Sequence, residues 1–185
     1  DLSYARSKNL LQWETAAGTP IALPMTLQTE GLIVDPVPVK GGIINGAAHM
    51  SFDSKTRLLI SYFKFDENGK TQAYVARLEN GAWNIRQITN WDYRWEFEGG
   101  GSLGIVDVAL GSVAVRPGGK LALPFKHVKA GSGELLLDEN TLCLLGMDPP
   151  KNLFPAALSH PRDPFPGLEV RWGEDKGRST EKGVR

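Results

Sequence analysis

Short apolar runs separated by turn residues dominate the chain. "RLLISYFKF" (57–65), "TQAYVARL" (71–78) and "WNIRQIT" (83–89) have strand length and are rich in β-branched and aromatic residues, and Asn68-Gly69 and Asn80-Gly81 separate them. Asn-Gly pairs supply the positive φ angles that tight hairpin turns require. This part of the sequence therefore predicts an antiparallel meander of three strands.

The same pattern continues toward the C-terminus. "LGSVAVRP" (110–117) and "KLALPFKHV" (120–128) flank a Gly-Gly turn, and "GELLLD" (133–138) precedes "TLCLLG" (141–146) across Glu139-Asn140. With 21 Gly and 12 Pro in 185 residues, little room is left for a long amphipathic helix. The sequence predicts an all-β chain of up-and-down antiparallel strands.

Two segments resemble each other and predict a repeat architecture. "YARSKNLLQW" (4–13) and "YVARLENGAW" (74–83) each place a Tyr nine residues before a Trp. Ser7, Asn9 and Trp13 also resemble a relaxed Asp-box hairpin, in which an acceptor side chain binds the N–H groups of the turn and the Trp packs between sheets. These features favour a β-propeller-type fold with four-stranded antiparallel blades.

The length of the chain predicts an incomplete propeller. At about 40–50 residues per blade, residues 1–146 hold roughly three to four blades, and an open set of blades would expose sheet edges. We therefore expect the remaining propeller blades of a longer protein, or self-association, to complete the structure. Residues 147–185 are rich in proline and then in mixed charge, which predicts a connector or tail, or the start of a further blade.

Charge and composition narrow the partners. Lys+Arg and Asp+Glu are both 21, so no basic excess favours nucleic acid, and no run approaches the roughly 18 apolar residues that span a membrane. Cys143 lies in an apolar run and is predicted to be a buried small hydrophobic residue. No cofactor is expected. The three widely spaced histidines form no metal motif, although the sequence leaves a structural calcium or zinc ion open.

The stretch "NWDYRWEFEGGG" (90–101) holds the densest group of aromatic residues. In a strand, neighbouring side chains point to opposite faces, so Asp92, Arg94 and Glu96 share one face and the aromatic side chains share the other. The aromatic face is either packed core or the wall of a sugar-binding site. The glycines at 99–101 would let the backbone turn sharply or approach a ligand.

Several long motifs resemble one family. "YARSKNLLQWE" (4–14), "FDENGKTQAYVAR" (65–77), "WDYRWEFEGGGS" (91–102) and "GSGELLLDENTL" (131–142) are similar to the BNR-repeat proteins that include the ulvan lyases, and the resemblance covers roughly residues 2–145. It implies a propeller of the seven-bladed type from a secreted or periplasmic polysaccharide-degrading system. It also implies elimination across a uronic acid of an acidic polysaccharide. The family pattern carries a histidine where this chain has Phe63, which makes a non-catalytic carbohydrate-binding propeller the alternative.

β-Elimination from a uronate requires a cation that neutralises the carboxylate, a base that removes the adjacent proton, and a group that protonates the leaving oxygen. Arg94 is the predicted neutraliser, and His127, His49 and Tyr93 are the candidate bases. His127 lies between two lysines, whose charges favour the neutral imidazole that a base requires.

Further side chains are candidates for substrate binding. They are Asn45, Lys64, Asp92 and Trp95. Lys64 shares a strand face with Asp66, so the two form either a surface ion pair or a substrate clamp. A hydrolase of the sialidase or rhamnosidase type would need two convergent carboxylates. Asp66, Asp92, Glu96 and Asp107 are available, but the sequence pairs none of them.

Overall fold

A computed structural model of the chain describes residues 1–97, 106–150, 156–158 and 160–170. The chain divides into two compact units, Asp1–Pro150 and Lys151–Arg185. The described part of the second unit contains one short 3-10 helix, η1 (Ala156–Leu158). The predicted tail at 147–185 stays a prediction, because 171–185 lie outside the described residues, as do the glycines at 99–101.

The first unit begins with short strands. β1 (Leu2–Ser3) pairs with β5 (Ile33–Asp35), and β2 (Arg6–Ser7), β3 (Trp13–Glu14) and β4 (Pro20–Ile21) form a three-stranded antiparallel sheet. Within the β2–β3 hairpin, the Asn9 side-chain oxygen accepts the N–H groups of Leu11 and Gln12 at 3.0 and 2.9 Å. Asn9 therefore binds the N–H groups of the turn, as the Asp-box pattern predicts.

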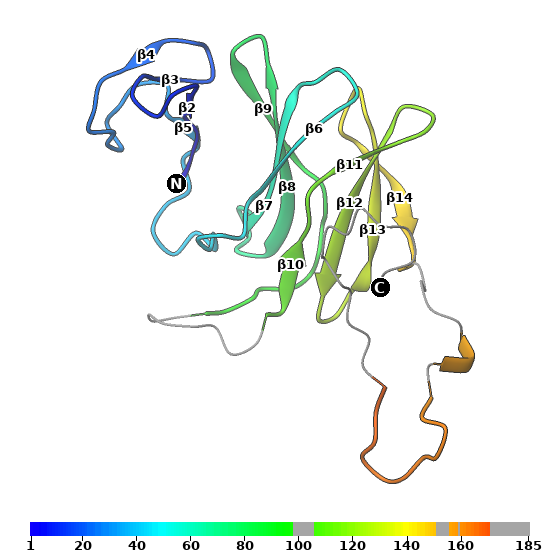
Figure 1. The fold of residues 1–185 in the computed structure, drawn as a ribbon. Coiled ribbons are helices and arrows are strands. Elements are labelled where there is room, and N and C mark those ends of the chain that lie inside the picture. Colours follow the sequence, from blue (N-terminus) through cyan, green and yellow to red (C-terminus); the bar gives the residue numbers. More distant parts are fainter. Residues whose placement is uncertain (98–105, 151–155, 159, 171–185) are drawn as a thin grey trace. The chain divides into compact units, whose positions relative to one another are not determined.

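The central sheet is a four-stranded meander. Its order is β6 (His49–Phe52), β7 (Leu58–Phe65), β8 (Thr71–Glu79) and β9 (Ala82–Gln87), and every pair is antiparallel. Figure 1 shows this sheet between the N-terminal strands and the strands that follow it. The predicted three-stranded meander is confirmed, and β6 supplies a fourth strand.

The two Asn-Gly turns of the central sheet differ from each other. Asn80 and Gly81 both have positive φ, 51° and 80°, as a two-residue hairpin turn requires. In the β7–β8 turn only Gly69 has positive φ (71°), and the N–H of Gly69 donates to the carbonyl of Asp66 at 3.0 Å. The β7–β8 turn is therefore longer than the β8–β9 turn. The Asp66 side chain closes it by accepting the N–H groups of Asn68 and Lys70.

The last sheet has five strands. β10 (Val108–Leu110) and β11 (Ala114–Arg116) both pair with β12 (Lys120–His127), which continues to β13 (Gly131–Asp138) and β14 (Leu144–Asp148). Both predicted hairpins of this region are present. All sheets are antiparallel and no α-helix occurs in the described residues, so the prediction of an all-β antiparallel chain is confirmed.

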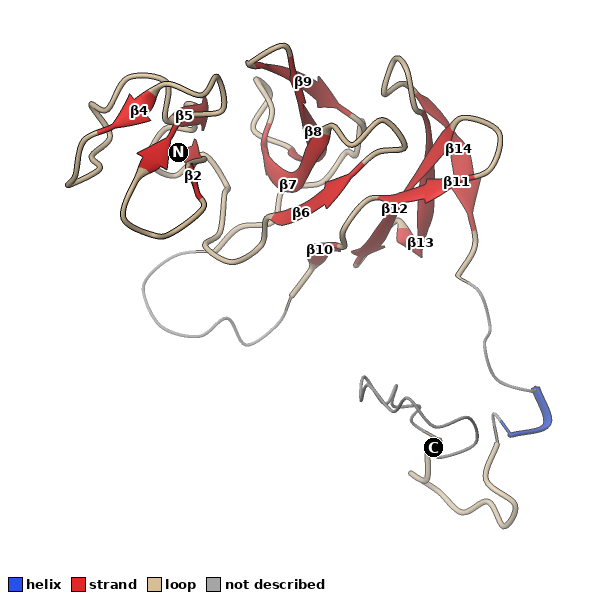
Figure 2. Cartoon of the chain, turned by 45° about the horizontal axis from the view of Figure 1, so that its top comes forward, coloured by secondary structure: helices blue, strands red, loops and turns tan. Residues whose placement is uncertain are grey.

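The central sheet is buried on both faces. Leu59, Phe63 and Val75 belong to one core cluster together with leucines of β12 and β13. The alternate residues Ile60 and Tyr62 belong to a second cluster together with residues of β1 and β5. Because side chains alternate along a strand, β7 and β8 send every second residue toward a different neighbouring sheet. The sheets, drawn in red in Figure 2, follow one another in chain order, as blades stacked face to face would.

Residues 90–97 are not a strand, yet their alternation is as predicted. Trp91, Tyr93, Trp95 and Phe97 pack against the first core cluster, whereas Asp92, Arg94 and Glu96 are exposed. The segment is held alongside β8 because the carbonyl of Tyr93 accepts the Thr71 N–H at 2.7 Å and Thr71 Oγ1 accepts the Trp95 N–H at 2.8 Å. The aromatic face is core between two sheets.

The prediction that Cys143 is buried is wrong, because the residue is exposed. The preceding residue, Leu142, has a positive φ of 59° and is fully buried. This left-handed residue in the β13–β14 turn interrupts the alternation, so that Leu142 enters the core and Cys143 points outward. No residue pattern signals this interruption, because left-handed leucines are uncommon.

Candidate functional site

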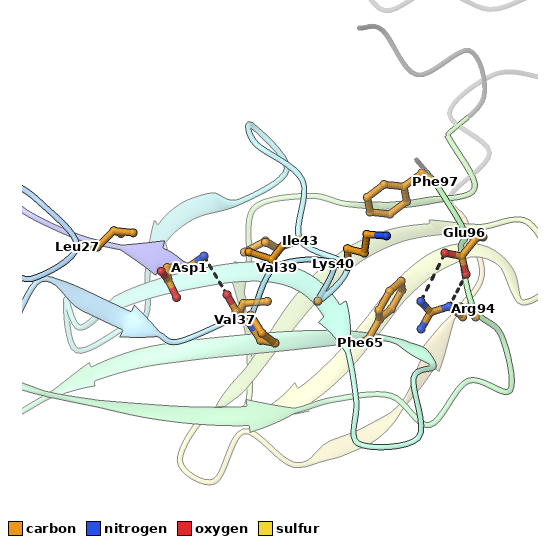
Figure 3. Close-up of a pocket in the computed structure, with 13 residues that line it drawn as sticks. Asp1, Leu27, Val37, Val39, Lys40, Ile43, Phe65, Arg94, Glu96 and Phe97 are labelled. Carbon is orange, nitrogen blue, oxygen red and sulfur yellow. Dashed lines mark hydrogen bonds and ion pairs between the residues drawn. The ribbon is translucent and has the colours of Figure 1, made fainter. Parts of the chain in front are cut away.

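Arg94 lines a cavity of the first unit. This cavity has a volume of about 780 Å³ and is lined by the loop 37–43, by residues at the end of the aromatic stretch and by residues from elsewhere in the chain. The lining residues are Asp1, Leu27, Val37, Pro38, Val39, Lys40, Gly41, Gly42, Ile43, Phe65, Arg94, Glu96 and Phe97. We call it the Arg94 cavity, and Figure 3 shows it.

Four contacts with three residues, among them a donation from Nη2 to Glu96 Oε1 at 3.5 Å, fix the Arg94 guanidinium at the wall of this cavity. Its central carbon lies 3.8 Å from the centroid of the Phe65 ring, a cation–π contact. Nη1 donates to the carbonyl of Gly69 at 2.9 Å, and Nε donates to the Glu96 carboxylate at 2.5 Å. Hydrogen bonding to Arg94 lowers the pKa of Glu96, so Glu96 is ionised at neutral pH. Arg94 is thus preorganised, and Glu96 offsets part of its charge.

The loop that covers Phe65 depends on glycine. Gly42 has a φ of 81°, and a Cβ at this position would lie 2.5 Å from the Phe65 ring. The adjacent Gly41 carbonyl accepts the Phe65 N–H at 2.9 Å. The loop can therefore lie directly on Phe65 and bring Lys40 to the same cavity, where Figure 3 shows it beside Phe65.

The chemistry of the Arg94 cavity suits an anion with an apolar body. A guanidinium presents a planar set of donors that matches the geometry of a carboxylate. Lys40 adds a second cation to the lining, and Phe65 and Phe97, whose ring centroids are 6.4 Å apart, add apolar ring faces. A sugar acid combines these two properties, because it has a carboxylate and C–H faces on one ring.

A second cavity brings together three of the predicted residues. Asn45, His49 and Trp95 line a space of about 240 Å³ with Phe63, and we call it the His49 cavity. Its other lining residues are Ile44, Gly46, Ala47, Val106, Val108, Ala109 and Leu110. Asn45 is exposed and His49 half-buried, whereas Trp95 and Phe63 are buried and form the floor.

His127 and Tyr93 lie together, away from both cavities. His127 is 3 % exposed, and its Nδ1 accepts the backbone N–H groups of Lys129 and Ala130 at 3.0 and 2.9 Å. Its ring lies 4.5 Å from the ring of Trp91 and 4.9 Å from that of Tyr93. The lone pair that a base would use is therefore occupied by the β12–β13 turn, and this geometry favours a structural role.

The electrostatics of this pair agree with that role. Burial lowers the pKa of His127, although the nearby Asp107 opposes the shift, so the ring is neutral at neutral pH. The Tyr93 hydroxyl donates to Asp107 at 2.6 Å, and this bond raises the pKa of Tyr93. A tyrosine acts as a base only when ionised, and the carboxylate beside Tyr93 opposes ionisation.

Lys64 and Asp92 also lie outside the two cavities. The predicted pairing of Lys64 with Asp66 is wrong: Lys64 Nζ contacts the buried Asp35 of β5 at 2.7 Å, and Asp35 also accepts the Tyr62 hydroxyl at 2.5 Å. Asp66 instead closes its own turn. Asp92 has a largely exposed side chain, 2.7 Å from Lys70, and hydrogen bonding to Lys70 lowers its pKa.

Sequence analysis missed the partners of Arg94. The sequence pattern places Phe97 on the aromatic face, which it leaves open as packed core or sugar-binding wall, and it does not single out Phe65 or Lys40. Phe65 lies on the same side of β7 as Phe63 and ends the strand, so its ring reaches beyond the core. The glycine pair at 41–42 was the one available signal, since adjacent glycines often mark a close approach of the backbone.

Two further features of the described residues concern ions and membranes. Within the described ranges, no group of three or more His, Cys, Asp or Glu side chains is arranged to hold a metal ion. This gives no support to a structural calcium or zinc ion, which stays a prediction. None of the helices in the described part of the chain is long and apolar enough to cross a membrane.

Comparison with known proteins gives one family match. Residues 1–91 match the model of a family described as "BNR repeat-containing family member". The matched region contains β1 to β9, and it suggests a carbohydrate-active protein with a propeller-like fold. No curated protein matches the chain. The narrower resemblance to the ulvan lyases therefore rests on the sequence motifs alone.

Proposed function

We propose that this chain is part of a propeller-type protein that recognises acidic glycans and binds a uronate in the Arg94 cavity. The observation that carries the proposal is the position of Arg94, which is held on the Phe65 ring at the wall of a cavity of about 780 Å³. The family match to residues 1–91 supports a carbohydrate ligand. A secreted or periplasmic location is part of the proposal, because acidic polysaccharides are encountered there.

Substitution of Arg94 tests this proposal directly. Arg94→Ala removes the guanidinium, so we expect the affinity for glucuronic acid, measured by isothermal titration calorimetry, to fall by about tenfold or more, as the loss of a charge-assisted bond implies. Arg86→Ala is the matched control, since Arg86 is an exposed arginine of β9 that lines neither cavity. Unchanged affinity in Arg94→Ala, with an unchanged melting temperature, would contradict the proposal.

Polysaccharide lyase activity is a second candidate function, and the position of His49 favours it. Of the three candidate bases, His49 lines one of the two cavities described above, and His127 and Tyr93 line neither. Against this, Phe63 stands in the same cavity where the family pattern has a histidine. If elimination occurs, incubation with ulvan or another acidic glycan will raise the ultraviolet absorbance of the unsaturated uronate. New reducing ends without that absorbance would indicate a hydrolase, and binding without either would leave recognition as the function.

A further inference from the structure

The Arg94 and His49 cavities lie side by side along one strand and one loop. Phe65 lines the first and Phe63 the second, and the two rings are on the same face of β7, about 7 Å apart along the strand. Residues 40–43 of the connecting loop line the Arg94 cavity, and residues 44–47 line the His49 cavity. Trp95 and Phe97 repeat this order, with ring centroids 5.2 Å apart.

The two cavities differ sharply in charge. The lining of the Arg94 cavity includes Lys40, Arg94 and Glu96. None of the described residues that line the His49 cavity is Lys, Arg, Asp or Glu. A carboxylate placed there would lose its hydration without gaining a counter-ion, which is costly. The His49 cavity therefore disfavours a second uronate.

The His49 cavity does suit an uncharged sugar ring. Besides the buried Phe63 and Trp95 rings, the partly exposed Ile44, Ala47 and Val106 give it an apolar lining, against which the C–H face of a sugar can lie. The Asn45 amide and the His49 imidazole stand at its rim and can exchange hydrogen bonds with hydroxyl groups. Val106, which is 49 % exposed, forms part of the opposite wall.

We infer that the His49 cavity is a second subsite, which binds an uncharged sugar next to the uronate in the Arg94 cavity. This inference rests on the proposed function and adds to it. The protein recognises two neighbouring sugars of a polymer differently. It binds one through its carboxylate and the other through its apolar face. Its preferred glycan alternates acidic and neutral sugars, and a polymer of uronates alone is a poorer ligand.

The test uses a substitution that fills the His49 cavity and leaves the Arg94 cavity unchanged. Val106→Trp places a large side chain in the His49 cavity, and Val128→Trp is the control, because Val128 is similarly exposed (59 %) but lines neither cavity. Three probes are titrated by calorimetry: glucuronic acid, trigalacturonic acid, and a trisaccharide with one glucuronate between two xyloses. The flanking xyloses allow either direction of binding.

For the wild-type chain, we expect the mixed trisaccharide to bind about tenfold more tightly than glucuronic acid or trigalacturonic acid, because a second ring is then buried. Val106→Trp abolishes this gain and leaves the affinity for glucuronic acid unchanged. Asn45→Ala, which does not fill the cavity, reduces the gain in part. Val128→Trp does not change the affinity for any of the three probes.

Two results would overturn the inference: a mixed-trisaccharide affinity that Val106→Trp leaves unchanged, or a trigalacturonate affinity equal to that of the mixed trisaccharide. Both leave binding of glucuronic acid at Arg94 intact. If instead the proposed function is wrong, Arg94→Ala will not change the affinity for any of the three probes. If the wild-type chain binds none of the three probes, both ideas fall.

Discussion

At the scale of single residues, His127 makes the stability of the first unit depend on pH. Its buried ring packs against Trp91 and Tyr93, and the charged groups near it are Asp107 and Lys129. The pKa of the folded state is below the usual 6.5, chiefly because of burial. Above about pH 6.5 the imidazole is neutral in both states, so folding is not penalised. As the pH falls further, the unfolded chain binds a proton first and unfolding becomes more favourable.

We therefore expect the free energy of unfolding to decline between about pH 6.5 and the folded-state pKa of His127, with a slope of up to about 1.4 kcal/mol per pH unit. Urea denaturation followed by tryptophan fluorescence at several pH values measures this. His127→Gln lowers stability at neutral pH, because ring packing and the turn bonds are lost, but it removes the decline. The exposed His160 provides the control: His160→Gln leaves the slope as in the wild type. A slope that persists in His127→Gln would contradict the assignment.

The residue scale also shows what the sequence could not supply. Alternation along 91–97 correctly put Arg94 and Trp95 on opposite faces, because it follows from local geometry alone. The partner of Lys64 could not be found in this way. Asp35 is 29 residues away in sequence, and only the packing of β5 against the central sheet brings it to Lys64. Asp66, two positions away, was the better guess from sequence and was wrong.

At the scale of elements, one buried arginine joins the central sheet to the last one. Arg77 of β8 is 2 % exposed, and its guanidinium donates to the backbone carbonyls of Glu139 and Asn140 in the β13–β14 turn. Its Nε also donates to Glu79 at 2.5 Å. From the other side, the Glu139 side chain accepts the Ser54 N–H at 2.7 Å. The β13–β14 turn is thus fixed to two points of the neighbouring sheet.

Arg77→Met should lower the free energy of unfolding by about 3 kcal/mol, because the buried Glu139 carbonyl and the partly buried Asn140 carbonyl lose their donor and methionine cannot replace it. Chemical denaturation provides the measurement. The control, Arg86→Met, removes an exposed arginine of the adjacent strand β9 and should change stability by less than about 0.5 kcal/mol. A loss of the same small size in Arg77→Met would show that the contact does not hold the sheets together.

Most of the longer strands could be predicted from the sequence pattern. The runs at 57–65, 71–78 and 120–128 became β7, β8 and β12 within a residue or two, because each is a full strand bounded by turn residues. The run predicted at 110–117 contains β11 but only the last residue of β10, and Gly111 and the residues after it break the pairing with β12 between these two strands. The short strands β1 to β5 had too few residues for an alternating pattern to appear.

At the scale of the whole first unit, apolar side chains remain on edge strands. Met50 and Phe52 of β6 are 64 % and 61 % exposed, and Leu145 and Met147 of β14 are 54 % and 55 % exposed. Met50 pairs with Ile60, so it lies on a face of the central sheet that is buried farther along. Edge strands that carry exposed apolar residues favour pairing with other strands. We propose that further blades of a longer protein, or a second copy of this chain, cover them.

The 185-residue chain on its own should therefore associate as its concentration rises, and light scattering coupled to size-exclusion chromatography will show this. Phe52→Lys should shift the chain toward the monomer, because a charge on the edge opposes burial. Val128→Lys tests whether any added charge has that effect, since Val128 is as exposed as Phe52 but lies in the β12–β13 turn. A chain that stays monomeric at all concentrations would argue against a second copy.

The burial of β7 on both sides limits how the gene can change. Leu59 and Phe63 contact one neighbouring sheet, and Ile60 and Tyr62 contact the other. Loss or gain of a single codon within this strand would exchange the two sets, and each sheet would then meet side chains of the wrong size. The loop between β4 and β5, by contrast, can lengthen or shorten without such an exchange. Insertions and deletions that survive in descendants of this protein are therefore expected in that loop and not within β7.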